Sequence, residues 1–145
     1  MRPSVRMRRA AGLIAVGLVA AIVTLPGASS MAGDPAADIK QVASEKLPNV
    51  PGKSVSAVVV KYEPGGKSGK HHHAGSVLAY VLSGAIRSEN SATGPAKVYK
   101  AGEAFFEPPG SEHLVSENAS TTEPASLLAI FVADDGAQLT TFEKK

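Results

Sequence analysis

The chain has 145 residues, no cysteine and a formal net charge of +2, with 15 lysine and arginine residues against 13 aspartate and glutamate residues. The absence of cysteine excludes disulfide crosslinks and a lipid anchor on cysteine. Residues 1–32 hold four of the arginines and no acidic residue, so residues 33–145 carry a formal charge of −2. That balance excludes an extended basic surface for nucleic acid, and the length suits one small domain.

Residues 1–32 are predicted to be a signal peptide. Four arginines within residues 2–9 precede an apolar run that reaches Leu25, and small residues follow up to Ala32. This order of positive charge, apolar run and small residues is typical of an export signal, and the apolar run is short for a membrane span. We therefore expect an exported protein, periplasmic or secreted, with no membrane association after cleavage. An uncleaved N-terminal anchor is the alternative.

Residues 33–53 are predicted to form a helix followed by a linker. Within residues 34–47, the apolar side chains of Ile39, Val42 and Leu47 recur at helical spacing, and prolines follow the segment. We expect this helix to pack on the outside of the main body. Its apolar face could cover the domain or contribute to a homodimer.

Residues 54–134 are predicted to form β-strands. The last residues, 135–145, are expected to fray as a polar tail. Short apolar and alternating runs in this region are separated by glycine and proline, which is typical of an all-β sandwich or barrel. The expected strands cover residues 55–62, 77–82, 85–89, 97–100, 104–107, 113–116 and 127–132.

All four histidines of the chain fall in two short motifs. His71 and His73 are two residues apart, so on a strand their side chains project to the same face, while His72 points the other way. His113 follows forty residues after His73. Imidazole is the commonest protein ligand for transition metals, and three imidazoles can hold one ion while leaving other positions open. The sequence therefore predicts a metal site formed by His71, His73 and His113. A solvated polar loop is the alternative.

Glycine and proline residues accompany both histidine motifs at fixed spacings. The patterns are Gly65-x5-His71-x-His73, Gly84 eleven residues later, and Gly102-x5-Pro108-x-Gly110-x2-His113. Over residues 55–132 they resemble the two motifs of the cupin superfamily, in particular small single-domain exported bacterial cupins. The resemblance implies a small antiparallel jelly-roll barrel, the double-stranded β-helix, with the metal near the barrel axis.

One departure from the cupin pattern affects the expected metal site. The family's first motif usually carries a glutamate four residues after its second histidine, and that position here is Val77. The resemblance then implies a site of three histidines without a carboxylate. Such an ion keeps its full positive charge and favours anionic or bidentate substrates.

Three further residues are candidates for the metal site or for a substrate pocket beside it. Glu107 could replace the missing carboxylate, orient a histidine, or be a surface charge, and surface charge is favoured. Tyr80 and Arg87 could line a substrate pocket, although a lone arginine on a strand is more often solvated and a tyrosine more often packs in the core.

The predicted function is that of an exported cupin that binds a divalent transition metal (Fe, Mn, Ni, Cu or Zn) and a small molecule. A metal-dependent dioxygenase or isomerase is one hypothesis. A non-catalytic domain that binds a small ligand or a metal is the second, and a structural protein with a vestigial site is the third. By analogy with other cupins, a homodimer is expected.

Overall fold

The computed structural model describes residues 37–143, and the predicted signal peptide lies outside this part of the chain. The described residues form antiparallel β-strands and no helix, so they hold none that could cross a membrane. The predicted all-β fold is confirmed. The strands are β1 (Ala37–Lys46), β2 (Lys53–Tyr62), β3 (Lys67–Ser68), β4 (His71–His73), β5 (Ser76–Ser83), β6 (Ala85–Asn90), β7 (Gly94–Lys100), β8 (Ala104–Glu107), β9 (Glu112–Asn118), β10 (Ala125–Asp134) and β11 (Thr140–Phe142).

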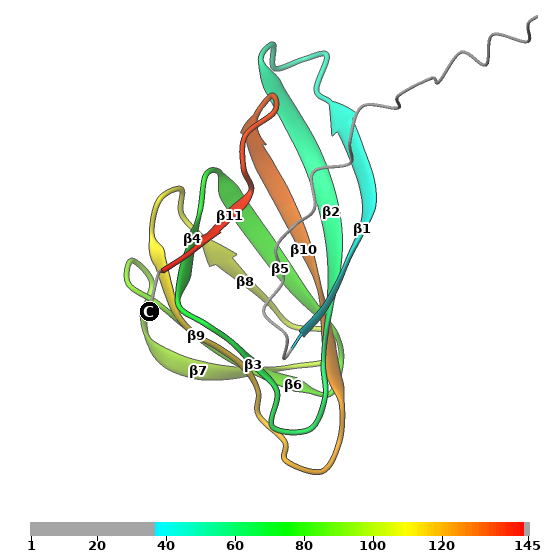
Figure 1. The fold of residues 1–145 in the computed structure, drawn as a ribbon, viewed down its shortest axis with the longest axis vertical. Helices are drawn as coiled ribbons and strands as arrows, with labels where there is room; N and C mark the ends of the chain where they lie inside the picture. The colour runs from blue at the N-terminus through cyan, green and yellow to red at the C-terminus, as the bar shows by residue number, and fades with distance from the viewer. Residues whose placement is uncertain (1–36, 144–145) are drawn as a thin grey trace, which may run out of the picture.

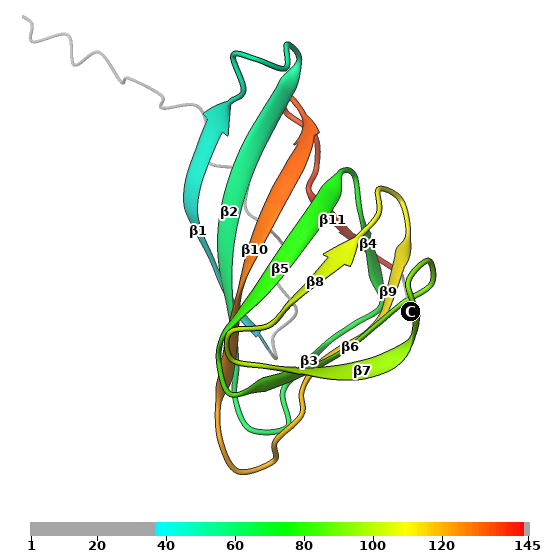
Figure 2. The ribbon, with the colours of Figure 1, turned by 180° about the vertical axis from the view of Figure 1, so that it is seen from behind.

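The strands form two sheets that face each other (Figure 1). The first has the order β1-β2-β10-β5-β8, which Figure 2 shows from behind. The second has the order β11-β4-β9-β6-β7, with β3 paired to β9. Sequence neighbours such as β4 and β5 lie in different sheets, so the chain passes repeatedly between them. This path places β4 and β9, which carry the two histidine motifs, side by side in the second sheet.

The core lies between the sheets and follows the alternation of the longest strands. In β10, Leu127, Ala129 and Phe131 are buried, whereas the side chains between them are more exposed. Val77 and Ala79 of β5 are buried in the same way. Alternation with a period of two is what a sheet needs when one face packs against another sheet and the other faces water. The apolar interior therefore extends along the inner face of the first sheet, up to the histidines.

The prediction of a helix over residues 34–47 is wrong for its described part, since residues 37–46 form the edge strand β1. This strand pairs with β2 along its whole length, with an irregularity between Gln41 and Ala43. Val42 falls at that irregularity and is exposed, while Ile39 packs against the core. Helical spacing of a few apolar residues is a weak signal, and the backbone hydrogen bonds offered by β2 outweigh it.

The C-terminal tail is also more ordered than predicted. Residues Thr140–Phe142 form β11 and pair with β4, so that Thr140 lies opposite His73 and Phe142 opposite His71. Threonine and phenylalanine favour extended backbone, and β4 would otherwise present an unpaired edge on this side. The expectation of a frayed tail is therefore wrong for this segment, which covers one side of the histidine pair.

Candidate metal centre

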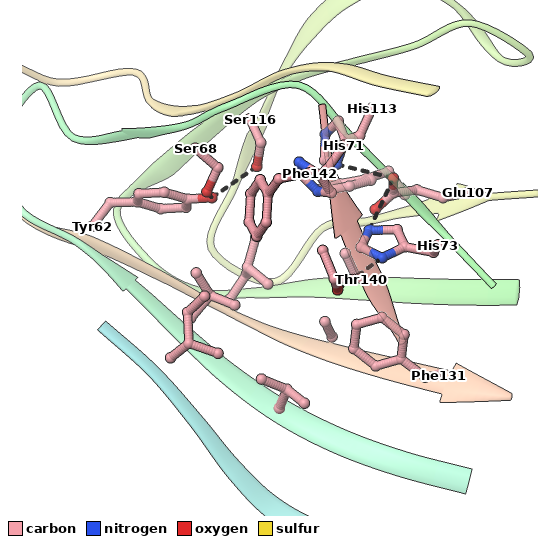
Figure 3. Close-up of a pocket in the computed structure, with 17 residues that line it drawn as sticks. Tyr62, Ser68, His71, His73, Glu107, His113, Ser116, Phe131, Thr140 and Phe142 are labelled. Atoms are coloured by element: carbon pink, nitrogen blue, oxygen red, sulfur yellow. Dashed lines mark hydrogen bonds and ion pairs between the residues drawn. The ribbon is translucent and has the colours of Figure 1, made fainter. Parts of the chain in front are cut away.

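The three histidines predicted as ligands lie together inside the barrel. His71 and His73 belong to β4, and His113 lies opposite His71 on the neighbouring strand β9. All three side chains are buried, and one ring nitrogen from each lies within 4.8 Å of the others. His72 is exposed, as the strand alternation predicts. The group is therefore a compact set of imidazoles that could hold one metal ion (Figure 3).

Hydrogen bonds fix the ring orientations of the first two histidines. The Nδ1 atom of His71 lies 2.7 Å from the carbonyl oxygen of Gly69, and Nδ1 of His73 lies 3.1 Å from the carbonyl oxygen of Leu139. A carbonyl oxygen only accepts, so each Nδ1 carries the proton and donates it. The Nε2 atom of each neutral ring is left with a lone pair. This is the arrangement in which histidine binds a metal through Nε2.

His113 is held by partners at both ring nitrogens. Its Nε2 lies 2.8 Å from the hydroxyl oxygen of Ser88, and its Nδ1 lies 2.9 Å from Oε2 of Glu107. The serine hydroxyl can donate or accept, so it can serve either protonation state of the ring. His113 is thus oriented by one residue of its own sheet and by one residue of the opposite sheet.

Glu107 is the last residue of β8 and is only 3% exposed, so the favoured reading of it as a surface charge is wrong. Its Oε2 atom lies 3.7 Å from Nε2 of His73, as well as close to His113. The alternation of β8 carried the signal for this burial, because Phe105 and Glu107 share the inward face. The carboxylate therefore faces two of the three histidines.

Burial and charge prepare these groups to bind a cation. Burial lowers the pKa of His71 to about 4, although the hydrogen bond to Gly69 opposes it. Burial lowers the pKa of His73 as well. For Glu107, burial alone would raise the pKa of the carboxyl, but the hydrogen bond from His113 and the charges of the histidines outweigh it and hold the pKa below its usual value. Near neutral pH, His71 and His73 are neutral and Glu107 is ionised.

A cavity of about 70 Å³ adjoins the histidines and extends over the inner face of the first sheet. Its side chains near the histidines include Phe131 and Phe142, and at the other end the Tyr62 hydroxyl lies 2.8 Å from both Ser68 and Ser116 (Figure 3). None of these five residues is predicted from the sequence to line the pocket, and Phe142 lies in the segment that is expected to fray. The cavity therefore has polar groups at both ends and a mainly apolar wall between them.

Tyr80 and Arg87 do not line this cavity, so the prediction that they belong to a substrate pocket is wrong. Tyr80 is 42% exposed, on the outer face of β5. Arg87 lies on the outer face of β6, and its Nη1 atom is 3.4 Å from Oε1 of Glu117. Strand alternation accounts for both positions, because the buried neighbours Ala79 and Ile86 take the inward face.

Comparison with known proteins gives a family and several similar folds. The model of the cupin domain matches residues 58–131, and no curated protein matches the chain significantly. An uncharacterized conserved protein from Klebsiella pneumoniae with a double-stranded β-helix domain is 22% identical, with a TM-score of 0.59, and the match covers 77% of this chain and 88% of that one.

Two enzymes of the same fold are also similar. An oxalate oxidase in complex with glycolate is 20% identical, with a TM-score of 0.58, and the match covers 80% of this chain and 59% of that one. An oxalate decarboxylase from Lactobacillus farciminis, in a formate complex, is 19% identical, with a TM-score of 0.60 and coverage of 75% and 32%. At these identities the likeness concerns the fold. With the match of the domain model over half of its length, the chain belongs to the cupin family.

Proposed function

We propose that this protein binds one divalent transition metal through His71, His73 and His113 and presents the ion to a small molecule in the adjoining cavity. The observation that carries the proposal is the convergence of three buried imidazoles, two of which have Nε2 free of its proton. Fe, Mn, Ni, Cu and Zn all accept imidazole ligands, so the donor set fits this group of metals without selecting one.

The cavity favours a small anionic ligand that binds through oxygen. Its volume of about 70 Å³ leaves room for only a few non-hydrogen atoms beside the histidines. No lysine or arginine is among the described residues that line it, so a bound cation would supply the positive charge that an anion needs. Small carboxylates fit this description, and two proteins of similar fold are complexes with glycolate and with formate.

The reaction that we propose is a metal-dependent conversion of such a ligand, either a dioxygenation or an isomerisation. A bound divalent ion acts as a Lewis acid that polarises substrate oxygens and stabilises developing negative charge. Within the chain, Gly69 and Leu139 hold the rings of His71 and His73 in place. Glu107 faces His73 and His113. The apolar side chains of Phe131 and Phe142 limit the water beside the site.

The proposal is tested by loading the metal-free protein, without a polyhistidine tag, with each metal in turn. We expect about one equivalent to bind per chain at micromolar concentration. We further expect azide, formate or glycolate to change the absorption or paramagnetic resonance spectrum of the loaded protein, because a three-histidine site leaves positions for exogenous ligands. Failure of every metal to bind would contradict the proposal. Binding with a spectrum that no added ligand changes would instead indicate a non-catalytic metal-binding cupin.

We also propose that the mature protein acts outside the cytoplasm. The support is the order of charged, apolar and small residues in positions 1–32. The mass of the protein recovered from its native cells should correspond to a chain that begins near residue 33. Recovery of the full-length chain from the cytoplasmic fraction would contradict this.

A further inference from the structure

We infer that Glu107 supplies a carboxylate ligand to the metal site, from the strand next to the one on which the family's first motif usually carries it. The inference rests on the proposed function, since it concerns the same ion. It replaces the expected site of three histidines with one of three histidines and one glutamate.

The register of the first sheet places Glu107 where it can take over this role. Glu107 of β8 lies directly opposite Val77 of β5, the position of the usual motif-one glutamate. Residues directly opposite in an antiparallel pair project to the same face, with Cβ atoms about 5 Å apart. Val77 is 1% exposed and faces the interior. A carboxylate at either position therefore enters the barrel in the same region.

The distances within the site agree with shared coordination. Ligand atoms about 2.1 Å from one ion are about 3.0 Å apart at right angles and about 3.6 Å apart at 120°. Oε2 of Glu107 lies 2.9 Å from Nδ1 of His113 and 3.7 Å from Nε2 of His73. The carboxylate oxygen is thus as far from two imidazole nitrogens as ligands of one ion are from each other. A bound ion and the proton between Glu107 and His113 are alternative occupants of that space.

The surroundings of Glu107 give it no permanent positive charge. Its ionic and hydrogen-bonding partners among the described residues are His113, His73 and Asn90, the last with its Nδ2 atom 3.4 Å from Oε2. A buried carboxylate is costly unless a charge or several hydrogen bonds compensate it. None of these partners is a lysine or arginine, so a divalent cation at this position would add the full positive charge that the carboxylate lacks.

The competing role for Glu107 is to orient His113 through a hydrogen bond without contacting the ion. Glu107→Gln separates the two roles, because the amide oxygen of glutamine still accepts a hydrogen bond from Nδ1 of His113 but carries no charge and is a weak metal ligand. If Glu107 is a ligand, we expect Glu107→Gln to weaken metal binding by more than about 100-fold, which exceeds the cost of losing a residue that only orients a ligand. Competition with a chromophoric chelator measures the affinity, and the resonance spectrum of bound Cu²⁺ should change with the loss of the carboxylate.

A second variant keeps the test decisive. Glu107→Val removes the carboxylate, and the double variant Val77→Glu/Glu107→Val returns one to the opposite position of the same pair. We expect the double variant to recover the affinity to within a few-fold of the parent and to regain its Cu²⁺ spectrum, whereas Glu107→Val alone should not. Circular dichroism of the metal-free proteins checks that each variant is folded.

The outcomes distinguish this inference from the proposed function. If Glu107→Gln binds metal with the affinity and spectrum of the parent, Glu107 is not a ligand and the inference is overturned, while the three-histidine site stands. If Glu107→Gln is weaker but the folded double variant recovers nothing, the position opposite Val77 is not equivalent and the inference also fails. If the parent protein itself binds no metal, the proposed function is contradicted, and this inference fails with it.

Discussion

Replacing His113 with alanine is expected to weaken metal binding by more than about 100-fold. Loss of a residue that only orients a ligand costs 10- to 100-fold in affinity, so loss of a ligand should cost more. No other imidazole can replace His113, because His72, the one histidine of the sequence outside the proposed ligand set, points out of the barrel. Calorimetric titration of the metal-free variant, or competition with a chelator, measures the effect.

The matched control is His72→Ala, which removes an imidazole from the same triplet but from its exposed face. We expect this variant to keep the parent affinity. Metal at about 100 times its dissociation constant should stabilise the parent and His72→Ala by about 2.7 kcal/mol, and His113→Ala by much less. Equal affinity of His113→Ala and the parent would show that the imidazoles do not share an ion.

The metal-free protein is expected to lose stability as the pH falls from about 7 to about 5. The pKa of His71 is about 4 in the folded protein against 6.5 when unperturbed, mainly because of burial. Between these values the unfolded chain binds a proton at His71 that the folded chain does not. Stability from this group is therefore complete above pH 6.5 and decreases at lower pH, by about 2 kcal/mol at pH 5 and about 3 kcal/mol at pH 4.

The other groups of the site act in the same direction. The pKa of His73 is lowered by burial, so protonating it disfavours the folded state in the same pH range. The pKa of Glu107 is lowered by His113 and its neighbours in spite of burial, so this group adds to the loss only below its usual value of 4.5. Urea unfolding in the presence of a chelator measures the free energy at each pH. His72→Ala should keep the dependence and His71→Asn should reduce it. A stability that is constant between pH 7 and pH 5 would contradict a site of buried neutral imidazoles.

Much of the fold follows from local pattern in the sequence. The alternation of buried and exposed residues in β5 and β10 is strong, since each packs one face on the opposite sheet, and these strands were predicted. The edge strand β1 was not, because a strand with one exposed edge and few buried side chains leaves little periodicity to detect. The strand is stabilised by pairing with β2, and the spacing of apolar residues within β1 does not reveal that pairing.

The part of the candidate site that depends on local sequence pattern could be predicted, and the part that depends on strand pairing could not. The spacing of His71 and His73 sets their common face, and the two motifs indicate that His113 joins them. The role of Glu107 depends on the register of β8 against β5, which brings it opposite Val77. No feature of either strand by itself reveals that register. Side chains on strands far apart in the sequence, such as Phe142 on β11 beside β4, are also beyond local pattern.

The most direct measurement of the central claim is anomalous diffraction at the absorption edge of a metal bound in crystals of the protein. We expect one strong anomalous peak per chain, within about 2.0–2.3 Å of a nitrogen from each of His71, His73 and His113. A peak elsewhere on the chain, or a fully metal-loaded crystal in which these three rings lack a common ion, would contradict it.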